Sequence, residues 1–349
     1  MGPLLPFNTL MPTFENLTEQ PAELVFLMDC SGSMQGQSIT LAREALVLFL
    51  HSLPCHCTFN IVRFGSAMDM LFPLSQPYSD DSLASALQLA ENLEADLGGT
   101  EILPPLNHLL TQRSIESRKT QIFVLTDGAV SNSMECVRTV GKLCNGTTRL
   151  FTVGVGPSVD RHLVKGLARA GGGTAVFTSR GEGMASKVLE QLQQALAPAF
   201  HLVDVDWGLE EGSVDKYMTY KTPQVVHQGA RLTLYRLFPK GAKVGKVTIT
   251  ASNRQKMVIE GSEEVLGELV HKMLARKMIQ ELEEEDAGEE EKFRREELIK
   301  EVALKYKLTS RFTSFVAVDL VRQQDLGELR VRQVRNLNIC SRESKVNIC

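Results

Sequence analysis

Short apolar runs alternate with helical patterns between residues 22 and 200. The apolar runs lie near residues 23–29, 58–64, 121–127, 149–155 and 174–178, with an edge strand expected near 69–74. The helical patterns lie near residues 37–53, 80–94, 103–113, 132–144, 160–170 and 183–196. Strands that alternate with helices in this way are typical of a parallel sheet joined by crossover helices. The sequence therefore predicts an α/β fold with a doubly wound, mainly parallel sheet flanked by helices.

Hydroxyl and carboxylate side chains gather where these expected strands end. Asp29, Ser31 and Ser33 follow the first apolar run, and Asp127 closes the run at 121–127. Thr100 follows paired glycines at the start of a helical pattern. In an open α/β sheet, ligands bind beyond the carboxyl ends of the strands. Oxygen ligands with few carboxylates suit a hard cation such as Mg²⁺, although an Asp or Ser after a strand is more often a helix N-cap.

The order of these residues resembles a known family. D-x-S-x-S at 29–33, a Thr after paired glycines and T-D-G at 126–128 are similar to the metal-ion-dependent adhesion site of von Willebrand factor A domains, which have a Rossmann-like fold. In that family the two serines and the threonine coordinate the ion, and the two aspartates act largely through bound water and hydrogen bonds. A carboxylate of a partner protein fills the open position.

The resemblance covers about residues 22–200 and implies both a site and a function. The implied metal site consists of Asp29, Ser31, Ser33, Thr100 and Asp127. The implied ion is Mg²⁺, with Mn²⁺ as the alternative. The implied function is a metal-dependent interaction module that binds an Asp or Glu of a partner protein.

Further segments resemble a narrower group. A-D-L-G-G-T-E-I-L at 95–103 and F-G-S at 64–66 are similar to the von Willebrand factor A domain-containing protein 5 group. Residues 308–319 resemble a segment shared by that group, the inter-alpha-trypsin inhibitor heavy chains and the vault poly(ADP-ribose) polymerase. Those proteins carry a vault/inter-alpha-trypsin domain ahead of the A domain. Because only residues 1–21 precede the first expected strand, we expect an N-terminal extension here and a short form or fragment of that architecture.

The pattern changes from about residue 200. Residues 203–207, 230–237 and 246–250 alternate polar and apolar side chains, which indicates antiparallel strands with one solvated face. We expect residues 314–318 to return as a further strand, after a charged helical hairpin at about 263–306. The sequence thus predicts a smaller antiparallel β module at 201–321 that contains this helical insertion. We expect the C-terminal tail at 322–349 to be disordered.

Composition narrows the location and the partners. The net charge of −4 argues against a nucleic-acid partner. Proteins that bind nucleic acids use a basic surface, whose Lys and Arg side chains displace the counterions of the phosphates. No apolar run reaches the length of a membrane span, and the amino terminus lacks the features of a signal peptide. The seven cysteines are odd in number and sparse, so we expect reduced thiols and a cytoplasmic location, with the nucleus as a second site. Secretion is the alternative, since the inter-alpha-trypsin heavy chains are secreted.

Three functions stay open. We favour the metal-dependent binding module, and the main alternative is a scaffold domain that assembles without an ion. A metal-assisted hydrolase is less favoured, because it needs a general base within reach of the attacking water. Of the seven histidines only His108 lies near a metal loop, and its expected place in a helix suits packing. The chain also lacks the P-loop and nucleophile-elbow motifs, so we predict that it is not an enzyme.

Overall fold

The computed structural model describes thirteen parts of the chain. They are residues 22–111, 119–128, 130, 132–144, 148–178, 183–197, 199–208, 225–227, 232–235, 246–251, 256–260, 268–284 and 289–315. The predicted N-terminal extension at 1–21 and the predicted tail at 322–349 lie outside the described residues. The chain divides into two compact units, with the division near residue 268. The domain boundaries predicted at 200 and 321 stay predictions.

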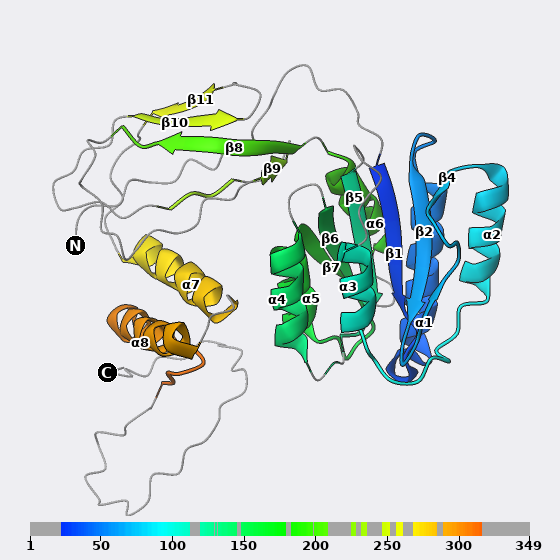
Figure 1. Ribbon diagram of the computed structural model, residues 1–349, viewed down its shortest axis with the longest axis horizontal. Coiled ribbons are helices and arrows are strands. Elements are labelled where there is room, and N and C mark those ends of the chain that lie inside the picture. The colour runs from blue at the N-terminus through cyan, green and yellow to red at the C-terminus, as the bar shows by residue number, and fades with distance from the viewer. Residues whose placement is uncertain are drawn as a thin grey trace, which may run out of the picture. The chain divides into compact units, whose positions relative to one another are not determined.

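A mainly parallel sheet dominates the larger unit (Figure 1). Its strands follow the order β3-β2-β1-β5-β6-β7, and β4 pairs with β2 beside this path. Strands β1, β2, β5, β6 and β7 run parallel to one another, whereas β3 and β4 run antiparallel to β2. The bounds are β1 (Ala22–Asp29), β2 (Thr58–Phe64), β3 (Met68–Met70), β4 (Gln76–Pro77), β5 (Lys119–Thr126), β6 (Thr148–Val155) and β7 (Gly172–Thr178). The predicted doubly wound α/β fold is confirmed.

Helices cover both faces of this sheet (Figure 1). They are the short 3-10 helix η1 (Gly32–Met34), α1 (Gln37–His51), α2 (Asp80–Glu91), α3 (Leu103–Thr111), α4 (Ser133–Leu143), α5 (Arg161–Ala170) and α6 (Met184–Leu196). Side chains of α1, α2 and α6 share one buried cluster, and those of α3, α4 and α5 share another. Strands β1, β2, β5 and β6 therefore bury both faces, which explains why the sequence shows continuous apolar runs there instead of alternation.

Strand β1 shows how the two clusters form. Phe26 and Met28 belong to the cluster under α1 and α6, whereas Val25 and Leu27 belong to the cluster under α3 to α5. The ring of Phe26 lies 5.3 Å from that of Phe49 and 5.5 Å from that of Phe123, measured between centroids. These aromatic contacts fix the centre of the sheet, from which the strands project their carboxyl ends toward the candidate site.

A second, antiparallel sheet has the strand order β11-β10-β8-β9. Its strands are β8 (Ala199–Asp206), β9 (Val225–His227), β10 (Lys246–Ala251) and β11 (Lys256–Glu260). The predicted strands at 203–207 and 246–250 are confirmed, whereas the described residues 232–235 form no continuous strand. Leu232 forms an isolated β-bridge, and both Leu232 and Tyr235 are buried, so burial accounts for the apolar positions there. Ser314 and Phe315 also lie outside any strand, and Phe315 is 56% exposed; residues 316–318 are not among the described ones.

The smaller unit is built around two helices, α7 (Leu269–Glu284) and α8 (Glu289–Tyr306). The ring of His271 in α7 stacks on that of Tyr306 in α8 at 6.5 Å between centroids. Arg276 donates to the carbonyl oxygen of Thr309 at 2.7 Å, which ties the residues after α8 back to α7. The predicted helical hairpin is therefore confirmed.

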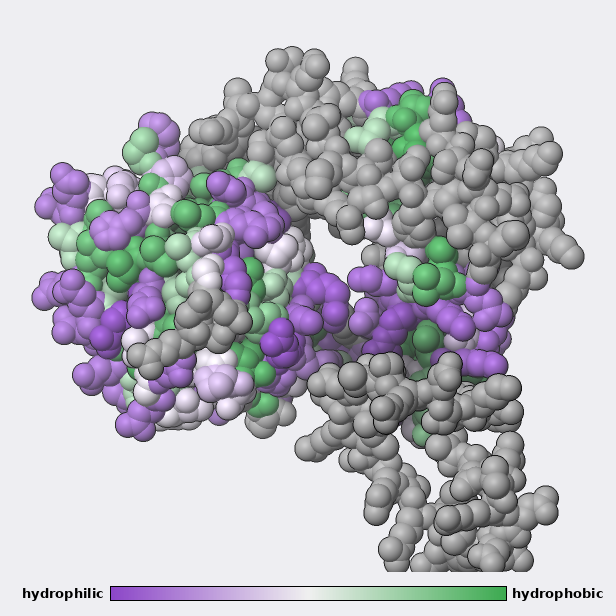
Figure 2. All heavy atoms as spheres, turned by 180° about the vertical axis from the view of Figure 1, so that it is seen from behind, coloured by the Kyte–Doolittle hydropathy of each residue, from purple (hydrophilic) through white to green (hydrophobic). Residues whose placement is uncertain are grey.

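The surface of the described residues mixes polar and apolar side chains. Figure 2 shows hydrophilic residues interspersed with hydrophobic ones over the described surface. None of the helices in the described part of the chain is long and apolar enough to cross a membrane.

Candidate metal centre

The loops that carry four of the five predicted site residues follow two neighbouring strands. Strand β1 ends at Asp29, and β5 ends at Thr126, directly before Asp127. The two strands are parallel partners, with Met28 opposite Leu125. Their carboxyl ends therefore lie next to each other, and the loops after them meet at one edge of the sheet.

Direct hydrogen bonds connect these loops. The hydroxyl groups of Ser31 and Ser33 lie 3.0 Å apart, and Ser33 Oγ donates to Asp127 Oδ1 at 3.2 Å. The backbone N–H of Ser31 donates to Asp29 Oδ1 at 3.0 Å, and Thr126 Oγ1 donates to Asp29 Oδ2 at 2.5 Å. Asp29, Ser31, Ser33 and Asp127 thus belong to one polar cluster.

Backbone contacts bring the loop of Thr100 to the same place. The N–H of Gly32 donates to the carbonyl of Gly98 at 2.7 Å, and the N–H of Leu97 donates to the carbonyl of Cys30 at 2.9 Å. Gly98 has φ +76°, in the left-handed region that favours glycine, and this turn sets the direction of the next two residues. The side chain of Thr100 is half-buried and makes no hydrogen bond to the described residues, so its oxygen is available as a ligand.

Ser66 supports this loop from the other side. Its Oγ accepts from the N–H of Gly99 at 2.7 Å, and its own N–H donates to the carbonyl of Leu97 at 2.6 Å. In the sequence, Ser66 stands out only as part of the F-G-S resemblance at 64–66. The contact could not be read from the chain, because nothing in the spacing shows that residues 66 and 99 meet.

The electrostatics of the cluster favour a cation. Asp29 is fully buried, and this burial raises the pKa of its carboxyl group. The hydrogen bonds from Ser31 and Thr126 oppose that shift, whereas the negative charge of Asp127 adds to it. The groups that shift this pKa are Ser31, Thr126 and Asp127, so none of them gives the carboxylate of Asp29 a cationic neighbour. A bound cation would supply the missing positive charge.

The donor set fits a hard divalent ion. It offers three hydroxyl and two carboxylate groups, and hard cations prefer such oxygen ligands. The described residues contain no group of three or more His, Cys, Asp or Glu side chains that could hold a metal ion, so a site here depends on the hydroxyl groups. Cys30 lies within the first loop but is buried, and burial raises the pKa of its thiol to about 12. A protonated thiol is neither a metal ligand nor a nucleophile.

Thr126 is a second residue whose role the sequence did not reveal. Its hydroxyl donates to Asp29 and also accepts from the N–H of Gly128 at 2.8 Å. It thereby fixes one oxygen of Asp29 and the turn that carries Asp127. The signal was present in T-D-G, but only the register of β1 against β5 shows that Thr126 faces Asp29.

Comparison with known proteins defines the class. Residues 22–177 match the von Willebrand factor type A domain family. The chain therefore carries a von Willebrand factor type A domain and belongs to the proteins that contain one. The solved structure of a von Willebrand factor type A protein from Catenulispora acidiphila aligns with a TM-score of 0.53, over 82% of this chain and 80% of that one. At 15% identity this likeness concerns the fold alone.

Longer relatives narrow the resemblance. Von Willebrand factor A domain-containing protein 5A of Rattus norvegicus is 33% identical over 324 residues, which cover 87% of this chain and 39% of the relative. A von Willebrand factor A domain-containing protein of Dictyostelium discoideum is 33% identical over 344 residues, covering 92% of this chain and 40% of the relative. The predicted similarity to the protein 5 group is confirmed. The chain spans about two fifths of the length of these two relatives.

Proposed function

We propose that the three loops form a metal-dependent protein-binding site. Ser31, Ser33 and Thr100 would coordinate Mg²⁺, with Mn²⁺ as the alternative, and Asp29 and Asp127 would act through water and hydrogen bonds. An Asp or Glu side chain of a partner protein would complete the coordination. The observation that carries this proposal is the hydrogen-bonded cluster in which Ser31, Ser33 and Asp127 meet above the buried Asp29.

The bound ion would supply positive charge between two sets of anionic oxygens, one from each protein. The chain's own residues hold their side of this contact in place. The N–H of Ser31 and the hydroxyl of Thr126 each bind one oxygen of Asp29, so both oxygens have a fixed orientation. The exposed Ser33 links this buried layer to Asp127. Such preorganisation lowers the cost of ordering the site when a partner binds.

We further propose that this site has a binding role and no catalytic one. The buried, protonated Cys30 is unsuited to nucleophilic attack, which supports a non-enzymatic function. A cytoplasmic location, with the nucleus as a second site, is supported by the free thiols of Cys30, Cys55, Cys57, Cys136 and Cys144.

Titration with Mn²⁺, followed by electron paramagnetic resonance, tests the proposal. The signal of free Mn²⁺ decreases as the ion binds, and we expect one site that Mg²⁺ displaces. The Ser31→Ala, Ser33→Ala double variant should lose this site. Ser85→Ala is the matched control, because Ser85 is exposed on α2 and, among the described residues, its hydroxyl bonds to the carbonyl of Asp81 alone. Unchanged binding by the double variant would contradict the proposal and favour the ion-independent scaffold.

A further inference from the structure

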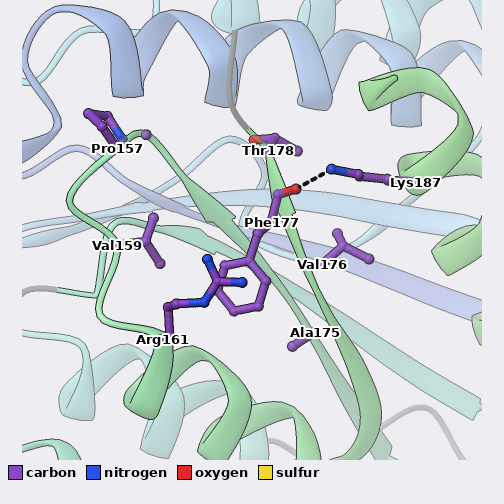
Figure 3. Close-up of a pocket in the computed structure, with 9 residues that line it drawn as sticks. Pro157, Val159, Arg161, Ala175, Val176, Phe177, Thr178 and Lys187 are labelled. Atoms are coloured by element: carbon purple, nitrogen blue, oxygen red, sulfur yellow. Dashed lines mark hydrogen bonds between the residues drawn. The ribbon is translucent and has the colours of Figure 1, made fainter. Parts of the chain in front are cut away.

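A cavity of about 470 Å³ lies at the carboxyl ends of β6 and β7 (Figure 3). Its walls are the loop after β6, the first residue of α5, the last residues of β7 and one side chain of α6. It shares the edge of the sheet with the metal loops, because the N–H of Asp160 donates to the carbonyl of Asp127 at 2.8 Å. None of the five predicted metal-site residues lines it, so it is a separate site.

Positively charged side chains surround the cavity. The guanidinium of Arg161 lies 4.1 Å from the ring centroid of Phe177, and Nζ of Lys165 lies 5.9 Å from the same point. Nζ of Lys187 donates to the carbonyl oxygen of Phe177 at 2.7 Å, as Figure 3 shows. Arg161 and Lys165 form no ion pair with the described residues, and the neighbouring Asp160 accepts two N–H groups of α5. Among the described residues that line it, the cavity therefore carries two cationic side chains, Arg161 and Lys187, and no acidic one.

The cavity also opens on a strand edge. In the described sheet β7 is the last strand, and β6 is its only partner. The carbonyl of Thr178 accepts from Gly156, which follows β6, whereas the carbonyl of Phe177 is bound by Lys187 on the other side. Backbone groups of successive residues in a strand face opposite neighbours. Ala175 and Phe177 therefore direct their backbone groups toward the open edge.

We propose that this cavity and the edge of β7 bind an extended acidic segment of a partner protein. The backbone of the segment pairs with Ala175 and Phe177, and a Glu or Asp side chain enters the cavity beside Arg161 and Lys187. The guanidinium of Arg161 offers N–H donors in a planar fork that can bind a carboxylate, and the ammonium group of Lys187 adds positive charge beside it. Strand addition supplies affinity through the main chain, and the cationic pocket supplies the preference for acidic side chains.

Fluorescence anisotropy tests this with two labelled peptides, one of alternating Glu and Val and one of alternating Gln and Val. All titrations contain EDTA, so that the metal loops do not contribute and a failure here is distinct from a failure of the metal site. We expect the Glu peptide to bind about tenfold more tightly than the Gln peptide. Equal affinity, or no binding of either peptide, would overturn the proposal.

Two variants separate this role from edge protection, since lysines also guard free strand edges against unwanted pairing. Arg161→Gln and Lys187→Gln should each weaken binding of the Glu peptide about tenfold and leave the Gln peptide unchanged. The control is Lys142→Gln, an exposed cation on α4 whose loss should change neither affinity. Tighter binding of the Gln peptide by Lys187→Gln would identify Lys187 as a guard and overturn the proposal.

Hydrogen exchange locates the bound peptide. The amides of Ala175 and Phe177 should exchange more slowly when the Glu peptide is present, because they become hydrogen-bonded in the extended sheet. Binding without slower exchange at these two residues would contradict strand addition.

Discussion

Adding Mg²⁺ should raise the melting temperature of the protein, because a ligand that binds only the folded state stabilises it. At a free Mg²⁺ concentration of about one hundred times Kd, the gain is about 2.7 kcal/mol. In a domain of about 150–250 residues, each kcal/mol raises the melting temperature by about 2–4 °C. The expected rise for the A domain is therefore about 5–11 °C, read from its unfolding transition by circular dichroism.

The Ser31→Ala, Ser33→Ala double variant should abolish this rise. The two hydroxyls are 3.0 Å apart and are removed together, so their mutual hydrogen bond disappears without leaving a partner. Asp127 Oδ1 loses the donor at 3.2 Å, and the buried Asp29 loses the side-chain hydrogen bond from Ser31, which together we expect to cost about 2 kcal/mol. The variant should thus stay folded in EDTA, with a melting temperature that Mg²⁺ does not change.

Calcium-free buffer with EDTA and the Ser85→Ala variant are the controls. Ser85→Ala should show the same Mg²⁺-dependent rise as the unmodified protein, since the exposed Ser85 hydroxyl bonds within α2, to the carbonyl of Asp81. A rise of equal size in the double variant would refute the assignment of the ion to Ser31 and Ser33.

Three further experiments test the turn at Gly98, the packing of Phe26 and the burial of the thiols. Gly98→Ala should lower the free energy of unfolding by about 1–2 kcal/mol, measured by urea denaturation, because a side chain is strained at φ +76°. It should also weaken Mn²⁺ binding by displacing Thr100. Full stability of this variant would contradict the role of this turn. Phe26→Ala should lower the free energy of unfolding by about 3–5 kcal/mol in the same assay, since it leaves a cavity beside Phe49 and Phe123. A decrease below about 1 kcal/mol would contradict the packing of these three rings. Iodoacetamide at about pH 8 should modify the exposed Cys55 and spare Cys30 and Cys144. Burial raises the thiol pKa of Cys30 and that of Cys144 to about 12, so their reactive thiolates do not form at about pH 8. Peptide mass spectrometry reads the result, and rapid modification of Cys30 in the folded protein would show that the first loop is open.

The A domain could be predicted closely because its strands are buried on both faces. Runs such as residues 23–29 and 121–127 have no other way to bury their side chains than between two layers of helices. The second sheet was harder to predict. Its short strand β9 has only three residues, and β10 shifts register between Thr250 and Ala251, so the period of two is interrupted.

The residues of the candidate site were also predicted only in part from the sequence. Asp29, Ser31, Ser33 and Asp127 drew attention because they lie at the ends of strong strand signals, and the resemblance to A domains grouped them with Thr100. Thr126 and Ser66 were missed, since their contacts depend on which residues face each other across the sheet and between loops. Such contacts are set by register and loop geometry, and the spacing of residues along the chain does not encode them.

Anomalous scattering from a crystal of the protein soaked in Mn²⁺ would locate the bound ion. We expect a single strong peak at the carboxyl end of β1, surrounded by the hydroxyl oxygens of Ser31, Ser33 and Thr100, with Asp29 and Asp127 in the layer behind. A peak elsewhere, or none at these loops with the three hydroxyls directed apart, would contradict this expectation.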